Sequence, residues 1–195
     1  MEVPFDTKKV TYPTIVCDVV PKKSETHQNR LMVGGNLLDY AGTLTTPTAT
    51  ITTTKCLFNS VVSTPNDKCT MTDIKNFYLK NLLPYPEYMN INISIIPQEN
   101  IDEYSLLEIV NDKGFVYIKT VKGMYGLKQA GIIAYQELIK HLEPYGYHPV
   151  KYTPRLWKHE TKDTLFSLVV YDFDIKYTSL DNAQQRLNAL KKHHL

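Results

Sequence analysis

The sequence has little of what marks several common protein classes. Its 195 residues include only three cysteines, at positions 17, 56 and 69, and these are too far apart for a zinc-binding pair. No apolar run reaches the roughly 18–20 residues that a membrane helix needs. The formal net charge is only +2, so the chain lacks the overall basic character that favours binding of polyanions. We therefore expect reduced cysteines and no membrane anchor.

The amino terminus gives no sign of export. Residues 1–10 contain two acids and two lysines but no apolar core, so they do not resemble a secretory signal peptide. We expect an intracellular, non-secreted protein. The composition is otherwise that of one or two globular units, with 43% hydrophobic and 22% charged residues. The 14 tyrosines suit sheet faces with one wet edge and also base-stacking surfaces, and composition does not separate these two uses.

The most informative stretch is residues 164–179. Apolar and smaller side chains alternate up to residue 170, which predicts a mostly buried strand, and a second extended piece follows from residue 175. Asp172 and Asp174 stand at the expected tip of this hairpin. An acid at the end of an apolar strand needs a cation, a hydrogen-bonding partner or water to stay ionised.

A second acid has a similar setting far upstream. Asp73 follows a semi-apolar strand candidate at residues 69–73. Two strands that each deliver an acid to the same edge of a sheet would form a platform for a divalent metal ion. A solvated acid at a strand end or helix start is the alternative for Asp73, and an ordinary hairpin tip is the alternative for Asp172 and Asp174.

The remaining pattern predicts an α+β fold with an antiparallel sheet and helices on one face. Strands are expected at residues 14–20, 29–38, 87–96, 115–121, 155–159 and 165–170, and helices at residues 49–63, 127–143 and 181–192. The first two strands would form an antiparallel ribbon. Gly34 and Gly35 interrupt the second strand, which indicates a bulge or the close approach of another backbone.

Three segments, in order along the chain, resemble motifs of copia-type retrotransposon reverse transcriptases. Residues 71–81, Met-Thr-Asp-Ile-Lys-Asn-Phe-Tyr-Leu-Lys-Asn, resemble the first catalytic motif. Residues 122–130, Lys-Gly-Met-Tyr-Gly-Leu-Lys-Gln-Ala, resemble the family's Leu-Tyr-Gly-Leu-Lys-Gln-Ala. Residues 169–177 fall where the family carries Tyr-Val-Asp-Asp, and residues 30–34 fall where its fingers carry Arg-Leu-Val-Ala-Lys-Gly. The match covers most of the chain.

The resemblance implies a reverse transcriptase fold that ends before the thumb. Residues 1–66 would be fingers-like and residues 67–195 palm-like, together forming one incomplete domain. It also implies RNA-directed DNA polymerase activity, two Mg²⁺ ions, a primer–template of RNA or DNA, and deoxynucleoside triphosphates. A retroelement polyprotein of this kind would reside in the cytoplasm or in a virus-like particle. Its oligomeric state does not follow from the motifs.

The resemblance further implies a set of functional residues. The catalytic acids would be Asp73 and Asp172, and the metal ligands would be Asp73, Asp172, Asp174 and the backbone carbonyl of Ile74. The nucleotide-binding residues would be Arg30, Tyr78, Tyr125, Gly126 and Lys128. Tyr78 would lie under the incoming sugar and exclude a 2′-hydroxyl, whereas Arg30 would contact the triphosphate.

One position departs from the family pattern. Tyr171 aligns with the first aspartate of the Asp-Asp pair, which is a metal ligand in the family. A tyrosine phenol is neutral at pH 7, because its pKa is about 10, and it binds magnesium poorly. Asp174 replaces a family glycine and could compensate. We therefore expect impaired polymerase activity, and the alternative is a non-catalytic nucleic-acid-binding remnant of a retrotransposon.

Overall fold

The computed structural model describes residues 10–19, 21, 26–40, 42, 48–169 and 172–194, apart from the side chains of residues 186 and 191–194. The chain forms two compact units, each made of two separate segments. The first unit comprises Met1–Leu44 and Asn81–Ala130, and the second comprises Thr45–Lys80 and Gly131–Leu195. The boundary predicted between residues 66 and 67 therefore does not coincide with the division into units, because the segment around it packs within the second unit.

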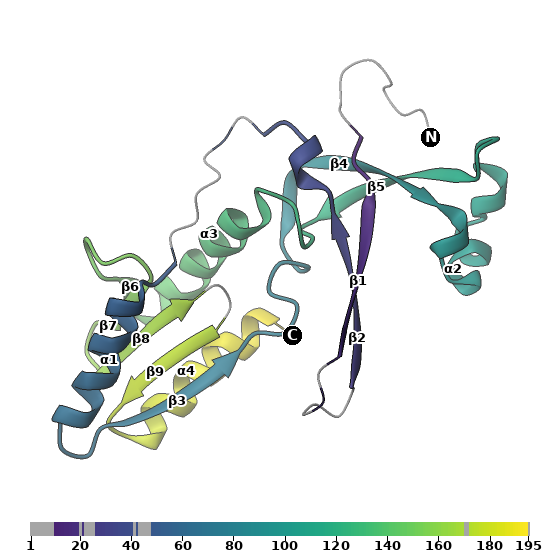
Figure 1. Ribbon diagram of the computed structural model, residues 1–195. Coiled ribbons are helices and arrows are strands. Elements are labelled where there is room, and N and C mark those ends of the chain that lie inside the picture. Colours follow the sequence, from purple (N-terminus) through teal and green to yellow (C-terminus); the bar gives the residue numbers. More distant parts are fainter. Residues whose placement is uncertain are drawn as a thin grey trace. The chain divides into compact units, whose positions relative to one another are not determined.

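The first unit is built from two antiparallel ribbons (Figure 1). Strands β1 (Pro13–Val19) and β2 (His27–Val33) form one, as the sequence predicts, and β4 (Leu82–Asn92) and β5 (Phe115–Lys122) form the other. Short helices complete the unit: η1 (Gly35–Leu37), η2 (Ile93–Ile95), α2 (Gln98–Glu103) and η3 (Leu106–Glu108). Thr11 bridges the two ribbons, because its backbone N–H donates to the Tyr88 carbonyl and its carbonyl accepts from Asn90.

The second unit contains one five-stranded antiparallel sheet with the strand order β3-β9-β8-β7-β6. Its strands are β3 (Lys68–Asp73), β6 (Tyr147–Pro149), β7 (Leu156–His159), β8 (Thr164–Val169) and β9 (Asp172–Tyr177). Its helices are α1 (Ile51–Ser63), α3 (Ala130–Leu142), η4 (Glu143–Tyr145) and α4 (Leu180–His194). The mixed α+β class with antiparallel strands is thus confirmed.

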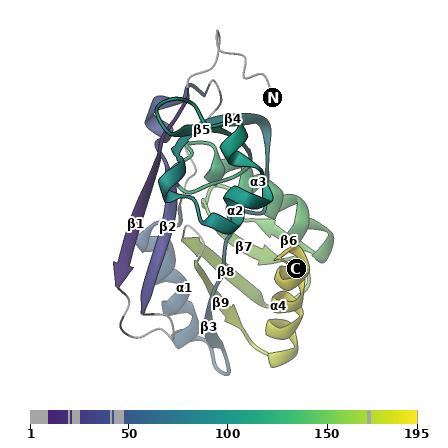
Figure 2. The ribbon, with the colours of Figure 1, turned by 90° about the vertical axis from the view of Figure 1, so that its right-hand side faces the viewer.

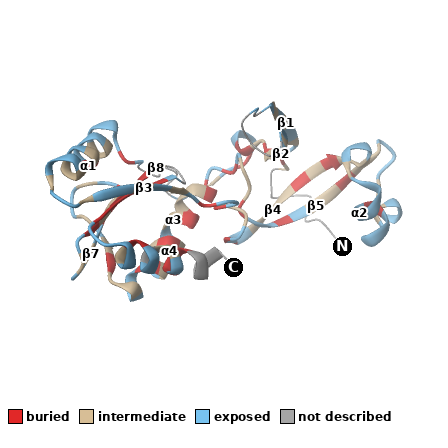
Figure 3. Ribbon diagram, turned by 90° about the horizontal axis from the view of Figure 1, so that it is seen from below, coloured by how far each residue is buried: buried red, intermediate tan, exposed pale blue. Residues whose placement is uncertain are grey.

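Helices cover both faces of this sheet, so the prediction of helices on one face is wrong. The core cluster joins apolar residues of β8 and β9, such as Phe166 and Ile175, to α3 and α4. On the opposite face the Lys176 ammonium donates to the Ser60 hydroxyl of α1 at 2.6 Å. Figures 2 and 3 show α1 and α4 on opposite sides of the strands. Residues 173–177 of β9 are all buried, as expected for a strand covered on both faces.

Several element boundaries differ from the prediction for physical reasons. The hairpin of residues 164–179 is confirmed, but β9 begins at Asp172, so Asp172 and Asp174 belong to the strand and not to a four-residue tip. Strand β4 begins at Leu82, ahead of the start predicted at residue 87, and passes through Pro84 and Pro86. Its pairing with β5 shifts register between Leu82 and Glu87, which accommodates the prolines. Within the described residues, no helix is long and apolar enough to cross a bilayer.

Candidate metal and nucleotide site

Two aspartates face each other across neighbouring strands of the second unit. Asp73 is the last residue of β3 and Asp172 is the first residue of β9, and the antiparallel register pairs them directly. Residues that are directly opposite in such a pair have Cα atoms about 4.5–5.5 Å apart. Both residues are exposed. The predicted meeting of positions 73 and 172 on one sheet is therefore confirmed, and it brings two carboxylates within reach of one cation.

The electrostatics at Asp172 reflect this crowding. The pKa of the Asp172 carboxyl is raised above its ordinary value, first by partial burial and then by the negative charges of Asp73 and Asp174. Like charges that are directly opposite on a sheet also destabilise the pairing. A bound cation or a proton would relieve both effects.

Asp174 lies on the same face of β9 as Asp172, because side chains two residues apart point to the same side. It is only 4% exposed, and the Ser167 hydroxyl of β8 donates to its carboxylate at 3.0 Å. The burial of this acid was not predicted. Its hydroxyl partner explains how it is accommodated, since a buried carboxylate needs a hydrogen-bond donor. Asp174 thus lies two residues further along β9 than Asp172 and is held by its hydrogen bond to Ser167.

The donor set suits a hard divalent cation. Mg²⁺ usually binds through one or two carboxylates, water and substrate phosphates, and the opposed carboxylates of Asp73 and Asp172 provide such a pair. In the part of the chain that the structure describes, no group of three or more His, Cys, Asp or Glu side chains is arranged to hold a metal ion. The residues therefore fit one cation that keeps water or phosphate ligands, and a second ion would need further donors.

Two further predicted site residues follow β3 in the chain. The side chain of Ile74 is buried in the core cluster of the second unit, so only its backbone could serve a ligand. Tyr78 is half-buried against the same cluster, with its ring centroid 5.6 Å from that of Phe77. Tyr78 is therefore fixed against the core.

The other predicted nucleotide-binding residues all belong to the first unit, and the structure brings them together there. The Arg30 guanidinium lies 5.9 Å from the centroid of the Tyr125 ring, within cation–π range. The Val33 N–H donates to the Tyr125 carbonyl at 2.8 Å. The Lys128 ammonium donates to the Leu38 carbonyl at 3.2 Å. These contacts link the β1–β2 ribbon to residues 125–128.

Gly126 is required at the centre of this junction. Its φ angle of +93° lies in the left-handed region, and a Cβ atom there would be 2.0 Å from the Val33 carbonyl oxygen. A Cβ atom on Gly35 would likewise be 2.1 Å from the Gly126 carbonyl oxygen. The sequence indicates a bulge or a close backbone approach at Gly34 and Gly35. The close approach is confirmed for Gly35, and the backbone that approaches it is that of Gly126.

The predicted site residues are thus divided between the units. The second unit carries the acids with Ile74 and Tyr78, and the first unit carries Arg30, Tyr125, Gly126 and Lys128. Tyr171, the position that departs from the family pattern, lies outside the described residues.

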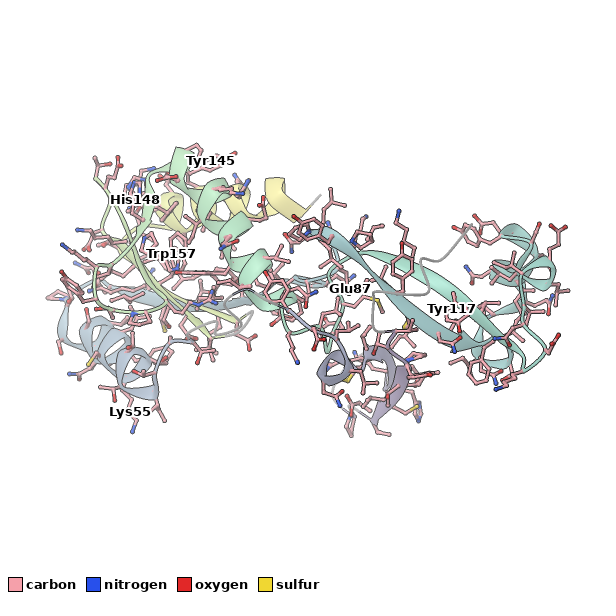
Figure 4. The ribbon with its side chains drawn as sticks, turned by 90° about the horizontal axis from the view of Figure 1, so that it is seen from above. Lys55, Glu87, Tyr117, Tyr145, His148 and Trp157 are labelled. Atoms are coloured by element: carbon pink, nitrogen blue, oxygen red, sulfur yellow. The ribbon has the colours of Figure 1, made fainter. Side chains whose placement is uncertain are left out.

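Two further charged side chains, Arg155 and Lys176, are buried in the second unit, and no sequence pattern predicts their burial. Arg155 is 3% exposed and lies 3.4 Å from the centroid of the Tyr135 ring, while burial lowers the pKa of its guanidinium to about 10. Lys176 forms an ion pair with Asp67 at 2.7 Å. Trp157, two residues after Arg155, and Tyr177, next to Lys176, are core aromatics, and Trp157 is labelled in Figure 4. The partners of these two side chains, Tyr135 for Arg155 and Asp67 for Lys176, are distant in the chain, so the local sequence does not reveal them.

Comparison of the chain with protein-family models, curated proteins and solved structures found no match in any of the three.

Proposed function

We propose that this chain is part of a retroelement RNA-directed DNA polymerase of the copia-type reverse transcriptase kind. The observation that supports the proposal most is the register that sets Asp73 opposite Asp172. Phosphoryl transfer to a primer 3′-hydroxyl needs cations held by carboxylates from neighbouring strands. The order of three motifs along the sequence supports the same assignment.

In this proposal the second unit holds the metal and the sugar. Asp73 and Asp172 bind Mg²⁺ with the Ile74 carbonyl, and bound Mg²⁺ would stabilise the attacking and leaving oxygens of nucleotidyl transfer. Tyr78, whose ring is fixed against the core, supports the sugar of the incoming nucleotide. Asp174 is the candidate for a further metal ligand, provided that its carboxylate turns away from Ser167.

The first unit supplies the phosphate contacts. The Arg30 guanidinium lies near the Tyr125 ring. In the proposal Arg30 would bind the triphosphate and Tyr125 the nucleobase. Lys128 would contact a template phosphate. The glycine junction at residue 126 lets the chain approach the β2 backbone closely enough to keep these groups together. The substrates are a primer–template and deoxynucleoside triphosphates.

The activity is impaired in this proposal because Tyr171 stands where the family has a metal-binding aspartate. The test is primer extension on poly(rA)·oligo(dT) with Mg²⁺. We expect negligible extension by the parent chain and measurable extension by Tyr171→Asp, because the added carboxylate completes the ligand set. Adding Asp73→Asn to that variant should abolish the gain, whereas adding Glu137→Gln, which changes an exposed acid on α3, should not.

Either of two results would contradict the proposal. Rapid extension by the parent chain would show that Tyr171 does not impair the site. Absence of extension by a folded Tyr171→Asp variant would remove the polymerase assignment.

The second candidate is a non-catalytic nucleic-acid-binding remnant, and the tyrosine at position 171 favours it. Such a protein would bind primer–template in a salt-dependent manner, because phosphate contacts release counterions. Its affinity would not change with Mg²⁺, and Asp73→Asn would leave binding intact. A polymerase site would instead bind primer–template and nucleotide more tightly when Mg²⁺ is added.

A further inference from the structure

One face of the β4–β5 ribbon in the first unit has an unusual composition. The register pairs Tyr88 with Lys119, Asn90 with Tyr117, and Asn92 with Phe115. Because side chains alternate along a strand, these six residues share one face of the ribbon. Figure 4 labels Tyr117 on β5 and Glu87, the neighbour of Tyr88, on β4.

The opposite face is the buried side of the ribbon. Met89, Ile91 and Val116 are each less than 5% exposed there, and Glu87 accepts a hydrogen bond from the buried Gln129 amide at 2.8 Å. On the six-residue face, by contrast, Lys119 is exposed and the other five residues are half-buried. The aromatic side chains therefore lie on the side of the ribbon that does not form its core.

The chemistry of this face is that of a base-stacking surface. Each of the three cross-strand pairs joins one aromatic ring to an amide or to the lysine, and none of the six side chains is acidic. Phe115, Tyr117 and Lys119 succeed each other on β5 at intervals of about 7 Å, which is twice the rise per residue of a strand. Nucleobases stack on aromatic side chains, and lysine attracts phosphate.

We propose that the outer face of β4–β5, formed by Tyr88, Asn90, Asn92, Phe115, Tyr117 and Lys119, binds single-stranded nucleic acid by base stacking. The bases stack on Tyr117 and its aromatic neighbours, and Lys119 contacts the backbone. The binding is sequence-tolerant, because every base offers a π face. This site shares no residue with the proposed catalytic set and requires no metal ion.

The charges around the ribbon indicate in which direction the bound nucleic acid extends. The segment beyond Asn92 and before Phe115 carries five acids, Glu99, Asp102, Glu103, Glu108 and Asp112, against the single lysine at position 113. A polyanion is repelled from that end of the ribbon. The nucleic acid therefore extends from Phe115 toward Lys119 and away from α2. The choice of nucleic acid as ligand rests on the proposed function, whereas the site itself does not depend on catalysis.

The test is fluorescence anisotropy of labelled oligo(rU) and oligo(dT) with the full chain at low salt. Tyr117→Leu keeps an apolar side chain of similar bulk but removes the ring, and we expect it to weaken binding at least about five-fold. Tyr117→Phe keeps the ring and should bind like the parent. Lys119→Gln should reduce the salt dependence, lowering the slope of log affinity against log salt by about 0.7.

Matched controls come from the second unit. Tyr152→Leu removes an exposed aromatic and Lys55→Gln removes an exposed cation on α1, and both should leave binding unchanged. Thermal melting of each variant checks the fold. No binding by the parent, equal binding by Tyr117→Leu, or a loss shared with Tyr152→Leu would overturn the proposal.

The outcomes also separate this site from the polymerase assignment. If Tyr171→Asp fails to extend a primer while Tyr117→Leu weakens binding, the stacking face stands and the polymerase assignment falls. If Tyr171→Asp extends a primer while Tyr117→Leu binds like the parent, the polymerase assignment is supported and the stacking face is rejected.

Discussion

The first unit keeps its strands in two-stranded ribbons, whereas the second gathers five strands into one sheet covered on both faces. The main core cluster lies entirely in the second unit, with Trp157, Phe166 and Leu138 among its fully buried members. Most residues of β1 and β2 are exposed or half-buried. A two-stranded ribbon is marginal by itself. The first unit has a smaller buried apolar face, with Met89, Ile91 and Val116, and depends in addition on backbone contacts between its segments, whereas the second depends mainly on side-chain packing.

The substitution with the largest expected effect on this difference between the units is Gly126→Ala in the first unit. The new Cβ would meet the Val33 carbonyl, and φ of +93° strains any residue with a side chain. We expect a loss of about 4 kcal/mol in the free energy of unfolding. Gly114→Ala is the matched control, since its φ is +77° but nothing lies within 4 Å of the added atom. It should cost only about 1 kcal/mol. Urea unfolding measures both, and similar losses would contradict the backbone junction.

The second unit can be tested at a polar contact instead. Lys176→Met removes the cation that holds Asp67 and Ser60, and thereby the polar link between α1 and β9. We expect a loss of about 2 kcal/mol, because the Asp67 carboxylate is left without its charged partner. Asp67→Asn combined with Lys176→Met should cost less than the sum of the single changes. Additive losses would show that the pair is not coupled.

The same pair predicts how stability depends on pH. The Lys176 hydrogen bond, acting against partial desolvation, lowers the pKa of the Asp67 carboxyl below its ordinary value of 3.8. A carboxyl whose pKa is lowered in the folded state contributes stability that is fully present above its unfolded pKa and is lost as the pH falls through the folded pKa. Acid unfolding should therefore be shallower in Lys176→Met below pH 3.8 than in the parent. Identical acid profiles would contradict this linkage.

The smallest expected effect is a gain. Tyr152 is exposed and has a left-handed φ of +63°, a conformation that glycine adopts without strain. Tyr152→Gly should therefore stabilise the protein by up to about 1 kcal/mol. Tyr152→Ala removes the same ring but keeps the strained φ, so it is the matched control and should give no gain. Thermal unfolding compares the two variants, and equal stability of both would contradict the backbone strain.

Much of the second unit could be predicted because its signals are local. The alternation in residues 164–170 indicates β8, and the apolar stripe of residues 51–62 indicates α1, whose start is capped by the Thr50 hydroxyl accepting from the Thr53 N–H. The two faces of β9 could not be predicted in this way. Asp174 and Lys176 appear solvent-facing by type, yet Ser167 and Asp67 allow them to be buried. Such partners come from other segments of the chain, so the periodicity of the β9 sequence does not reveal them.

The candidate site shows the same division. Asp73 and Asp172 stand at the ends of recognisable strands, so the strand pattern permits their meeting, which the motif resemblance favours and the register confirms. The Ser167 partner of Asp174 and the buried Arg155 depend on tertiary contacts. The predicted boundary near residue 66 also differs from the structure, because composition along the chain does not reveal units built from discontinuous segments.

The interleaved segments have a consequence for synthesis on the ribosome. The chain passes between the units three times, at residues 44–45, 80–81 and 130–131. Neither unit can close until late in translation, since β5 and Gly126 complete one and β8 and β9 complete the other. Until then the apolar stripe of α1 has no sheet to cover, and it is a natural binding site for a holdase chaperone. A nascent chain stalled before β8 should be captured by such chaperones and released once β9 has emerged.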